Sequence, residues 1–225
     1  MNPTAHHLLA LLDGRAAAWV ARVRAVAEGS GPVPGSAFLD ELAAASRRLG
    51  KAEIALTDAE RTELEGAGLS LPPGLTLDEL GRIAMLAALP EAEQEAIASE
   101  CFHRGDARER RAVLRALPLL PAPSRFVALA ASACRTHILP VFEAICCENP
   151  YPASFFTDAT FHQMILKALF LDVALDRVLG LGERKTPELH RMVHDYAAER
   201  RAAGRSVPSD IDHHFRAGGS AQRSP

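Results

Sequence analysis

Apolar residues recur at intervals of three and four along most of the chain, which is the period of an amphipathic helix. No segment shows the strict alternation of apolar and polar residues that is typical of a half-buried strand. Together with the prolines and glycines that interrupt it, this pattern predicts about nine helices. The predicted helices are 3–28, 36–49, a short one from residue 58, 76–89, 90–105, 106–118, 124–148 with a break at Pro140, 158–180 and 187–204.

Polar residues at the predicted boundaries indicate where several helices begin. Thr57 precedes Glu60 by three positions, and Thr76 precedes Glu79 by the same spacing. This is the spacing of a capping box, in which two side chains satisfy backbone N–H groups at a helix start. Asp106 is a favourable N-cap for the helix that follows it.

The NPYP motif at residues 149–152 divides the C-terminal half of the chain. We expect it to form an extended turn, because a residue that precedes proline is disfavoured in the α region. The helix predicted after it should bury one stripe of apolar residues with a 4-3-4-3 spacing. The stripe comprises Met164, Ala168, Leu171, Leu175 and Val178.

Helices of roughly 15 residues joined by tight turns predict an all-α fold of stacked antiparallel hairpins, similar to HEAT repeats. Residues 106–135 fit one hairpin, and residues 76–105 fit its neighbour. We expect a single domain over residues 1–215. The polar, glycine-containing tail, residues 216–225, should be disordered.

Composition argues against nucleic-acid binding, membrane spanning and secretion. The 25 basic and 28 acidic residues give a net charge of -3, which provides no general basic surface for nucleic acid. No apolar run approaches the roughly 20 residues of a membrane-spanning helix, and the N-terminus lacks the pattern of a signal peptide. We expect a cytoplasmic protein with reduced, partly buried thiols. Its cysteines are Cys101, Cys134, Cys146 and Cys147.

Charged residues interrupt apolar helical segments on both sides of the NPYP motif. Arg135, Glu143 and Lys167 lie among Leu, Ile and Phe, where an unpaired charge is costly. The plainer interpretation is an ion pair that joins Glu143 to Lys167 or to Arg135. The alternative is a polar pocket for a carboxylate, a phosphate or a phenol. Asn149 should bond to backbone groups and cap the end of the preceding helix, and Tyr151 should pack on the turn or line a cleft.

Other polar pairs carry weaker signals. Asp195 and Glu199 lie four residues apart on a helix, so nearby arginines such as Arg200 should compensate their repulsion. Three other sets of residues could bind a metal ion, but each lacks a supporting motif. They are His190 with His194, Asp172 with Asp176 as magnesium ligands, and the tandem His213–His214. Glycine-rich phosphate loops and nucleophile elbows do not occur. We therefore assign no metal, no cofactor and no catalytic residue.

A series of motifs in the C-terminal half identifies a family resemblance. Five motifs follow one another in this order: RAVLRALPLL (111–120), CRTHILPVFEAI (134–145), NPYP, QMILKALF (163–170) and DYAAERRAAGR (195–205). In these motifs the chain resembles the EboA family of bacterial metabolite-traffic proteins over residues 106–210, with only a loose match before them. Phe161 and Arg201 stand where the family pattern has Trp, and the SVPSDID segment lacks the family's Glu-Leu-Trp.

The resemblance implies a non-enzymatic component of a secondary-metabolite traffic or export system. The implied partners are proteins of the same gene cluster, including a membrane prenyltransferase-like protein, and a hydrophobic precursor. Peripheral contact with the inner membrane is compatible with this role. The motifs and the charges described above give these candidate ligand- or partner-binding residues: Arg135, Glu143, Asn149, Tyr151, Gln163, Lys167, Asp195, Tyr196, Glu199 and Arg200.

Two other functional classes stay open from the sequence. One is an enzyme that acts on an aromatic or prenylated precursor, with Glu143 or the Asp195/Glu199 pair as acid–base groups. The other is a scaffold without a small-molecule pocket. A pocket of about 300 Å³ or more would argue against the scaffold.

Overall fold

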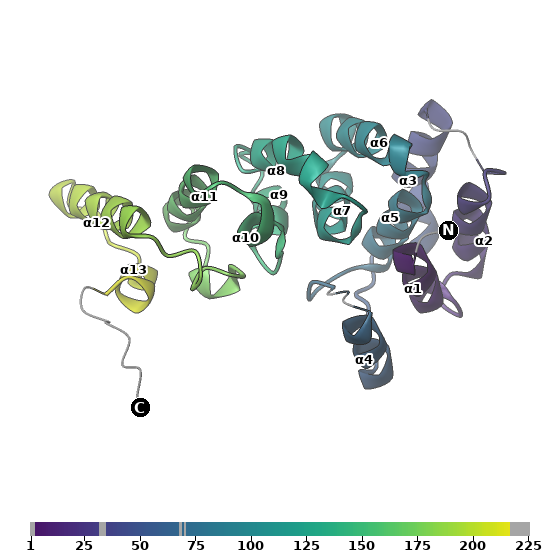
Figure 1. Cartoon of the computed structure of the whole chain (residues 1–225), viewed down its shortest axis with the longest axis horizontal. Helices are drawn as coiled ribbons and strands as arrows, with labels where there is room; N and C mark the ends of the chain where they lie inside the picture. The colour runs from purple at the N-terminus through teal and green to yellow at the C-terminus, as the bar shows by residue number, and fades with distance from the viewer. Residues whose placement is uncertain (1–2, 32–34, 68, 70, 217–225) are drawn as a thin grey trace.

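A computed structural model describes residues 3–31, 35–67, 69 and 71–216, and these residues form α-helices and short 3₁₀-helices (Figure 1). The prediction of an all-α fold is confirmed. The only β-type pairing in the described part of the chain is an isolated bridge between Glu53 and Thr76. Residues 217–225 of the predicted tail lie outside the described residues, and whether residues 1–215 form one domain stays a prediction.

The N-terminal half supplies the first seven helices. They are α1 (Pro3–Leu12), α2 (Ala17–Ala27), α3 (Ser36–Leu49), α4 (Asp58–Gly66), α5 (Leu77–Ala88), α6 (Glu91–Arg104) and α7 (Ala107–Ala116). The C-terminal half adds α8 (Val127–Ala133), α9 (Leu139–Cys146), α10 (Tyr151–Phe155), α11 (Asp158–Phe170), α12 (Pro187–Ala202) and α13 (Ser209–His214). Three 3₁₀ segments, η1 (Leu117–Leu119), η2 (Pro123–Phe126) and η3 (Leu175–Arg177), join them.

The helices follow one another along the long axis of the molecule, from the N-terminal group at one end to α12 and α13 at the other (Figure 1). At the N-terminal end α5 is central: it packs against α1, α2, α3 and α7. In turn, α7 packs against α9. This succession is compatible with stacked hairpins, and the closer HEAT-like assignment stays a prediction.

The burial of α5 on all sides accounts for its central position. All but one residue of α5, Leu77, are buried, whereas the other long helices bury a single face. A helix that is buried on every side needs neighbours all round it. Since Asp78, Glu79 and Arg82 are among its buried residues, α5 also carries charge into the core.

Two predicted capping boxes are present in full or in part. Thr57 accepts a hydrogen bond from the N–H of Glu60, and the Glu60 carboxylate accepts one from the N–H of Thr57. At Thr76 the N–H donates to the Glu79 carboxylate at 3.3 Å. Asp106, predicted as an N-cap, accepts from the N–H of Glu109. Side-chain chemistry in the sequence therefore located these helix starts correctly.

The N-terminal helix predicted over 3–28 is two helices. The chain turns at residues 13–16, where Gly14 adopts a φ of 76° that favours glycine. The turn places α1 and α2 against each other and against α5. The apolar period continued through the turn, and for this reason the prediction merged the two helices.

The extended turn predicted for NPYP is wrong. Pro150 is helical and leads directly into α10, where Pro152 occupies the first turn and needs no hydrogen-bonded N–H. The side chain of Asn149 makes this start possible: its Oδ1 accepts from the N–H of Tyr151, and its Nδ2 donates to the carbonyls of Leu114 and Ala144.

The helix predicted over 158–180 ends at Phe170. Asp172 adopts a left-handed φ of 57°, after which the chain continues into η3. Leu175 and Val178 are buried, as the predicted stripe requires, but they lie in and directly after η3 and not in α11. The helix α13 was not predicted.

Candidate functional site

The ion pair predicted for Glu143 has a different partner. Glu143 accepts from Nη1 of Arg177 at 2.6 Å, and Glu148 accepts from Nε of the same arginine at 2.8 Å. The bonds to Glu148 and then Glu143 raise the pKa of Arg177 above its ordinary value. Arg135 is exposed. The predicted pairing of Glu143 with Arg135 or Lys167 is therefore wrong, because η3 brings Arg177 to Glu143.

Lys167 closes the end of α8 instead. Its Nζ donates to the carbonyl oxygens of Cys134 at 2.7 Å and Thr136 at 2.5 Å. It also lies 4.9 Å from the centre of the Phe142 ring. Burial lowers the pKa of this ammonium group. A lysine that bonds the last carbonyls of a helix stabilises that helix end, so Lys167 connects α11 to α8.

Asn149 and Tyr151 both form hydrogen bonds within the folded chain. Asn149 is buried, and its amide makes the three backbone bonds described above. The side chain of Tyr151 is buried, and its hydroxyl donates a hydrogen bond to the carbonyl of Pro123 at 2.6 Å. Burial raises the pKa of Tyr151 above its ordinary value.

The other predicted residues on α11 and α12 are exposed or half-buried. Gln163 and Glu199 are exposed. Asp195 accepts from Arg191 at 2.7 Å, so the cation that compensates it is Arg191 on its own helix. Arg200 donates to the carbonyl of Ser206, and its guanidinium lies 5.8 Å from the ring of Tyr196.

The most strongly buried charges lie on α5, outside the predicted set. Asp78 accepts from Arg82 on its own helix at 2.7 Å and from Arg108 of α7 at 2.6 Å. Ser46 of α3 and Thr76 donate their hydroxyl groups to the same carboxylate, at 2.7 and 2.6 Å. Arg82 also donates to the carbonyl of α3 residue Leu42, so this network joins α3, α5 and α7.

Glu79 forms a second pair of contacts with α7. Its Oε2 accepts from Nη1 of Arg115 at 2.7 Å, and its Oε1 lies 3.2 Å from Nε of Arg111. Burial alone would raise the pKa of Asp78, but bonds from Arg108, Thr76, Ser46 and Arg82 hold it well below its usual range. Both carboxylates are compensated by arginines. This network therefore positions helices and offers little to a ligand.

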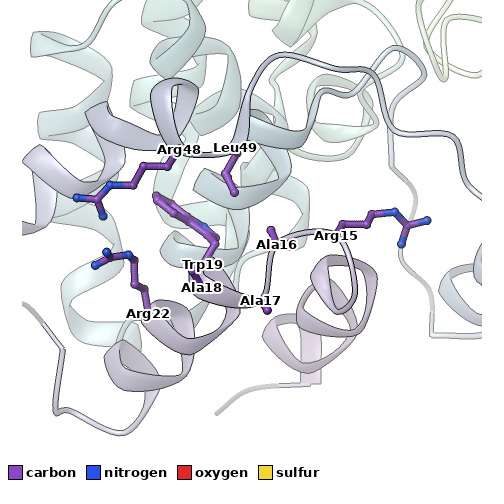
Figure 2. Close-up of a pocket in the computed structure, with 8 residues that line it drawn as sticks. All are labelled: Arg15, Ala16, Ala17, Ala18, Trp19, Arg22, Arg48 and Leu49. Atoms are coloured by element: carbon purple, nitrogen blue, oxygen red, sulfur yellow. The ribbon is translucent and has the colours of Figure 1, made fainter.

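A pocket of about 480 Å³ lies next to this network, where the turn between α1 and α2, helix α2 and the end of α3 meet (Figure 2). Its volume is in the range of small-molecule sites. Trp19 of α2 and Leu49 of α3 are its large apolar lining residues, and Trp19 contributes only a small part of its ring, since it is 2% exposed. The residues that line it are Arg15, Ala16, Ala17, Ala18, Trp19, Arg22, Arg48 and Leu49.

The charge around the pocket is positive on one side. Arg22 and Arg48 extend in the same direction beside the Trp19 ring, whereas Arg15 points the other way (Figure 2). One carboxylate, Glu41, pairs with both Arg22 and Arg48. Two guanidinium groups and one carboxylate leave one net positive charge on this side. Arg15 is neutralised by Glu60 at 2.7 Å, and this bond lowers the pKa of Glu60 to about 2.

Gly81 of α5 fixes the wall of the pocket. Its carbonyl accepts a hydrogen bond from Nε1 of Trp19 at 3.0 Å. A Cβ at this position would lie 2.3 Å from Cδ1 of Leu49 and 2.9 Å from Nε1 of Trp19. Glycine in the middle of α5 therefore lets α2 and α3 approach closely enough to form the pocket.

We expect Gly81→Ala to destabilise the fold by about 1–3 kcal/mol, because the added methyl group overpacks the contact with Leu49 and Trp19. The emission maximum of Trp19 should shift as its ring moves. Gly66→Ala is the control, since a Cβ at this helical position meets no atom within 4 Å. Chemical unfolding and fluorescence that leave Gly81→Ala indistinguishable from wild type would contradict the close packing.

The comparison with family models decides the identity of the chain. The model for metabolite traffic protein EboA matches residues 4–215. The chain belongs to the EboA family. The comparisons with curated proteins and with solved structures found no match.

The EboA match is longer than the motifs indicated. The sequence motifs covered residues 106–210, whereas the family match also includes the residues that line the pocket beside Trp19. None of the helices in the described part of this EboA protein is long and apolar enough to cross a membrane. The pocket at the N-terminal end is thus our candidate functional site.

Proposed function

We propose that this EboA protein is a non-enzymatic component of a bacterial secondary-metabolite export system. In this proposal it carries a hydrophobic precursor with one anionic group in the pocket beside Trp19. Membership of a family of metabolite traffic proteins supports the general role. The observation that supports the ligand is a pocket of about 480 Å³ whose lining includes Trp19 and Leu49, with one net positive charge beside it.

The ligand class follows from the residues of the pocket. Leu49, the three alanines and the small exposed part of Trp19, which is 2% exposed, give the ligand an apolar surface, so an apolar ligand body is favoured. Guanidinium groups bind carboxylate and phosphate well, because their donors match the geometry of these anions. Arg22 and Arg48 share Glu41, so an anionic group of the ligand would compete with that carboxylate for their donors. One anionic group balances the net charge.

Partner proteins remain part of the proposal, on a different surface. Exposed polar residues of the C-terminal half, among them Arg135, Gln163 and Glu199, keep their predicted role there. Proteins of the same traffic system, including a prenyltransferase-like membrane protein, are the proposed partners. Because one proposed partner is a membrane protein, we propose a cytoplasmic location with peripheral contact at the inner membrane.

The enzymatic alternative receives less support from the geometry. Glu143 would have to leave Arg177, and Asp195 would have to leave Arg191, before either could transfer a proton. A general base needs access to its substrate within hydrogen-bond distance. Neither residue lines the pocket beside Trp19.

The role in traffic can be tested by metabolite profiling of the source cells. We expect cells that lack the chain to accumulate a precursor in the cytoplasm and to lose the corresponding product outside it. Wild-type chain should restore the distribution, and a variant with a disrupted pocket should not. Identical profiles with and without the chain would contradict the proposed function.

A further inference from the structure

Two histidines and an aspartate meet at the C-terminal end of the described chain. His213 and His214 are the last residues of α13, and Asp176 lies in η3, far from them in the sequence. One ligand atom from each of the three lies within 4.8 Å of the other two. Neither the proposed traffic role nor the pocket beside Trp19 uses these residues.

The two segments are held together independently of the cluster. Oδ2 of Asp210 in α13 accepts from the backbone N–H of Leu175 in η3 at 2.6 Å. Ile211 and Phe215, on either side of the histidine pair, are buried in the core. Arg177, the neighbour of Asp176, is fixed by Glu143 and Glu148. The backbone that carries the three side chains is therefore preorganised.

The spacing suits a transition-metal ion. Oδ1 of Asp176 lies 3.1 Å from Nε2 of His214 and 3.8 Å from Nε2 of His213. Ligand atoms about 2.1 Å from a shared tetrahedral ion lie about 3.4 Å apart. His213 and Asp176 are largely exposed, so small rotations of these side chains can equalise the distances.

A second observation concerns the orientation of His214. Its Nε2 is buried, and among the described residues it has no hydrogen-bond partner. The carboxylate of Asp176 is close at 3.1 Å, but the two groups are not aligned as donor and acceptor. An imidazole nitrogen that faces a carboxylate without a well-aligned hydrogen bond can direct its lone pair to an ion shared with that carboxylate.

We infer that Asp176, His213 and His214 bind one divalent transition-metal ion of the zinc type. Two imidazole nitrogens and one carboxylate oxygen form a donor set that zinc and cobalt accept. The ion would join α13 to η3 and leave a fourth coordination position for water or another ligand. No residue pattern in the sequence pairs Asp176 with the histidines, because they are separated by the whole of α12.

Calorimetric titration of the full chain, without an affinity tag and treated first with chelator, tests this inference. Zn²⁺ is the probe, and Co²⁺ gives visible absorption bands that report the coordination. We expect one strong site. The variants His213→Ala and Asp176→Asn, both at largely exposed side chains, should each weaken binding at least about tenfold without unfolding the chain.

The double variant His6→Ala/His7→Ala is the matched control, because it removes two adjacent histidines of α1 whose rings also lie near each other. It should bind Zn²⁺ like the wild type. Loss of the site in His213→Ala and Asp176→Asn, but not in the control, supports the inference. Absence of Zn²⁺ binding by the wild type, or equal binding by all variants, would overturn it.

Discussion

We expect Asp78→Asn to destabilise the protein by about 3–5 kcal/mol, because it leaves buried arginine without its counter-charge. Arg82 is 1% exposed, and its guanidinium bonds to the Asp78 carboxylate. Arg108 of α7 loses the same partner. Urea unfolding followed by circular dichroism measures the change, and the loss should weaken the packing of α3 and α7 on α5 together.

The control and the pH dependence make this prediction specific. Asp158→Asn breaks an exposed ion pair with Arg184 and should change stability little. The pKa of Asp78 is lowered on folding, so its contribution is present above its unfolded pKa, about 4. The contribution is lost as the pH falls through the still lower folded pKa. A difference between wild type and variant that vanished at pH 7 would contradict the network.

The double variant Arg22→Gln/Arg48→Gln should bind an anionic aromatic ligand about 10- to 100-fold more weakly than the wild type. It removes both cations from one side of the pocket and leaves Glu41 unpaired, so the local charge becomes negative. Anilinonaphthalene sulfonate is a suitable probe. Trp19 is the only tryptophan of the chain and lines the pocket, so energy transfer from it reports binding there.

Arg24→Gln/Arg47→Gln is the matched control for the pocket. These two arginines lie on the same helices, α2 and α3, but do not line the pocket. The control removes the same amount of charge and should leave the affinity for the probe unchanged. Equal weakening by both double variants would mean that the probe senses net charge alone.

Local features of the fold could be predicted from the sequence where a side chain acts on its own backbone. Thr57 with Glu60 and Asp106 with its helix behaved as expected, because caps depend on residues three or four positions apart. The turn at Asn149 did not, since the amide of Asn149 bonds to Leu114, 35 residues away. Rules about neighbouring residues contain no information on such a contact.

The candidate site was harder to predict for the same reason. The sequence drew attention to Arg135, Glu143 and Lys167, because these charges interrupt apolar helices. The partners of Glu143 and Lys167, however, come from η3 and from the carbonyls at the end of α8, whose positions depend on tertiary packing. Around the pocket, Trp19 and Arg48 come from different helices and have no shared spacing.

One signal for the buried network was present in the sequence. Asp78, Glu79 and Arg82 interrupt the apolar pattern of α5, and Arg108, Arg111 and Arg115 recur at helical spacing in α7. Complementary charges on two helices, the acidic residues of α5 and the arginines of α7, indicate that these helices pack against each other through the charges. This comparison between helices would have identified the network.

Native mass spectrometry of the chain isolated from its own cells tests the central claim most directly, namely that the pocket beside Trp19 carries a metabolite. We predict that one small hydrophobic acid co-purifies with the wild type and with Arg24→Gln/Arg47→Gln. It should be missing from Arg22→Gln/Arg48→Gln. A wild-type chain that carries no small molecule, or a molecule that all three proteins retain equally, would contradict the account.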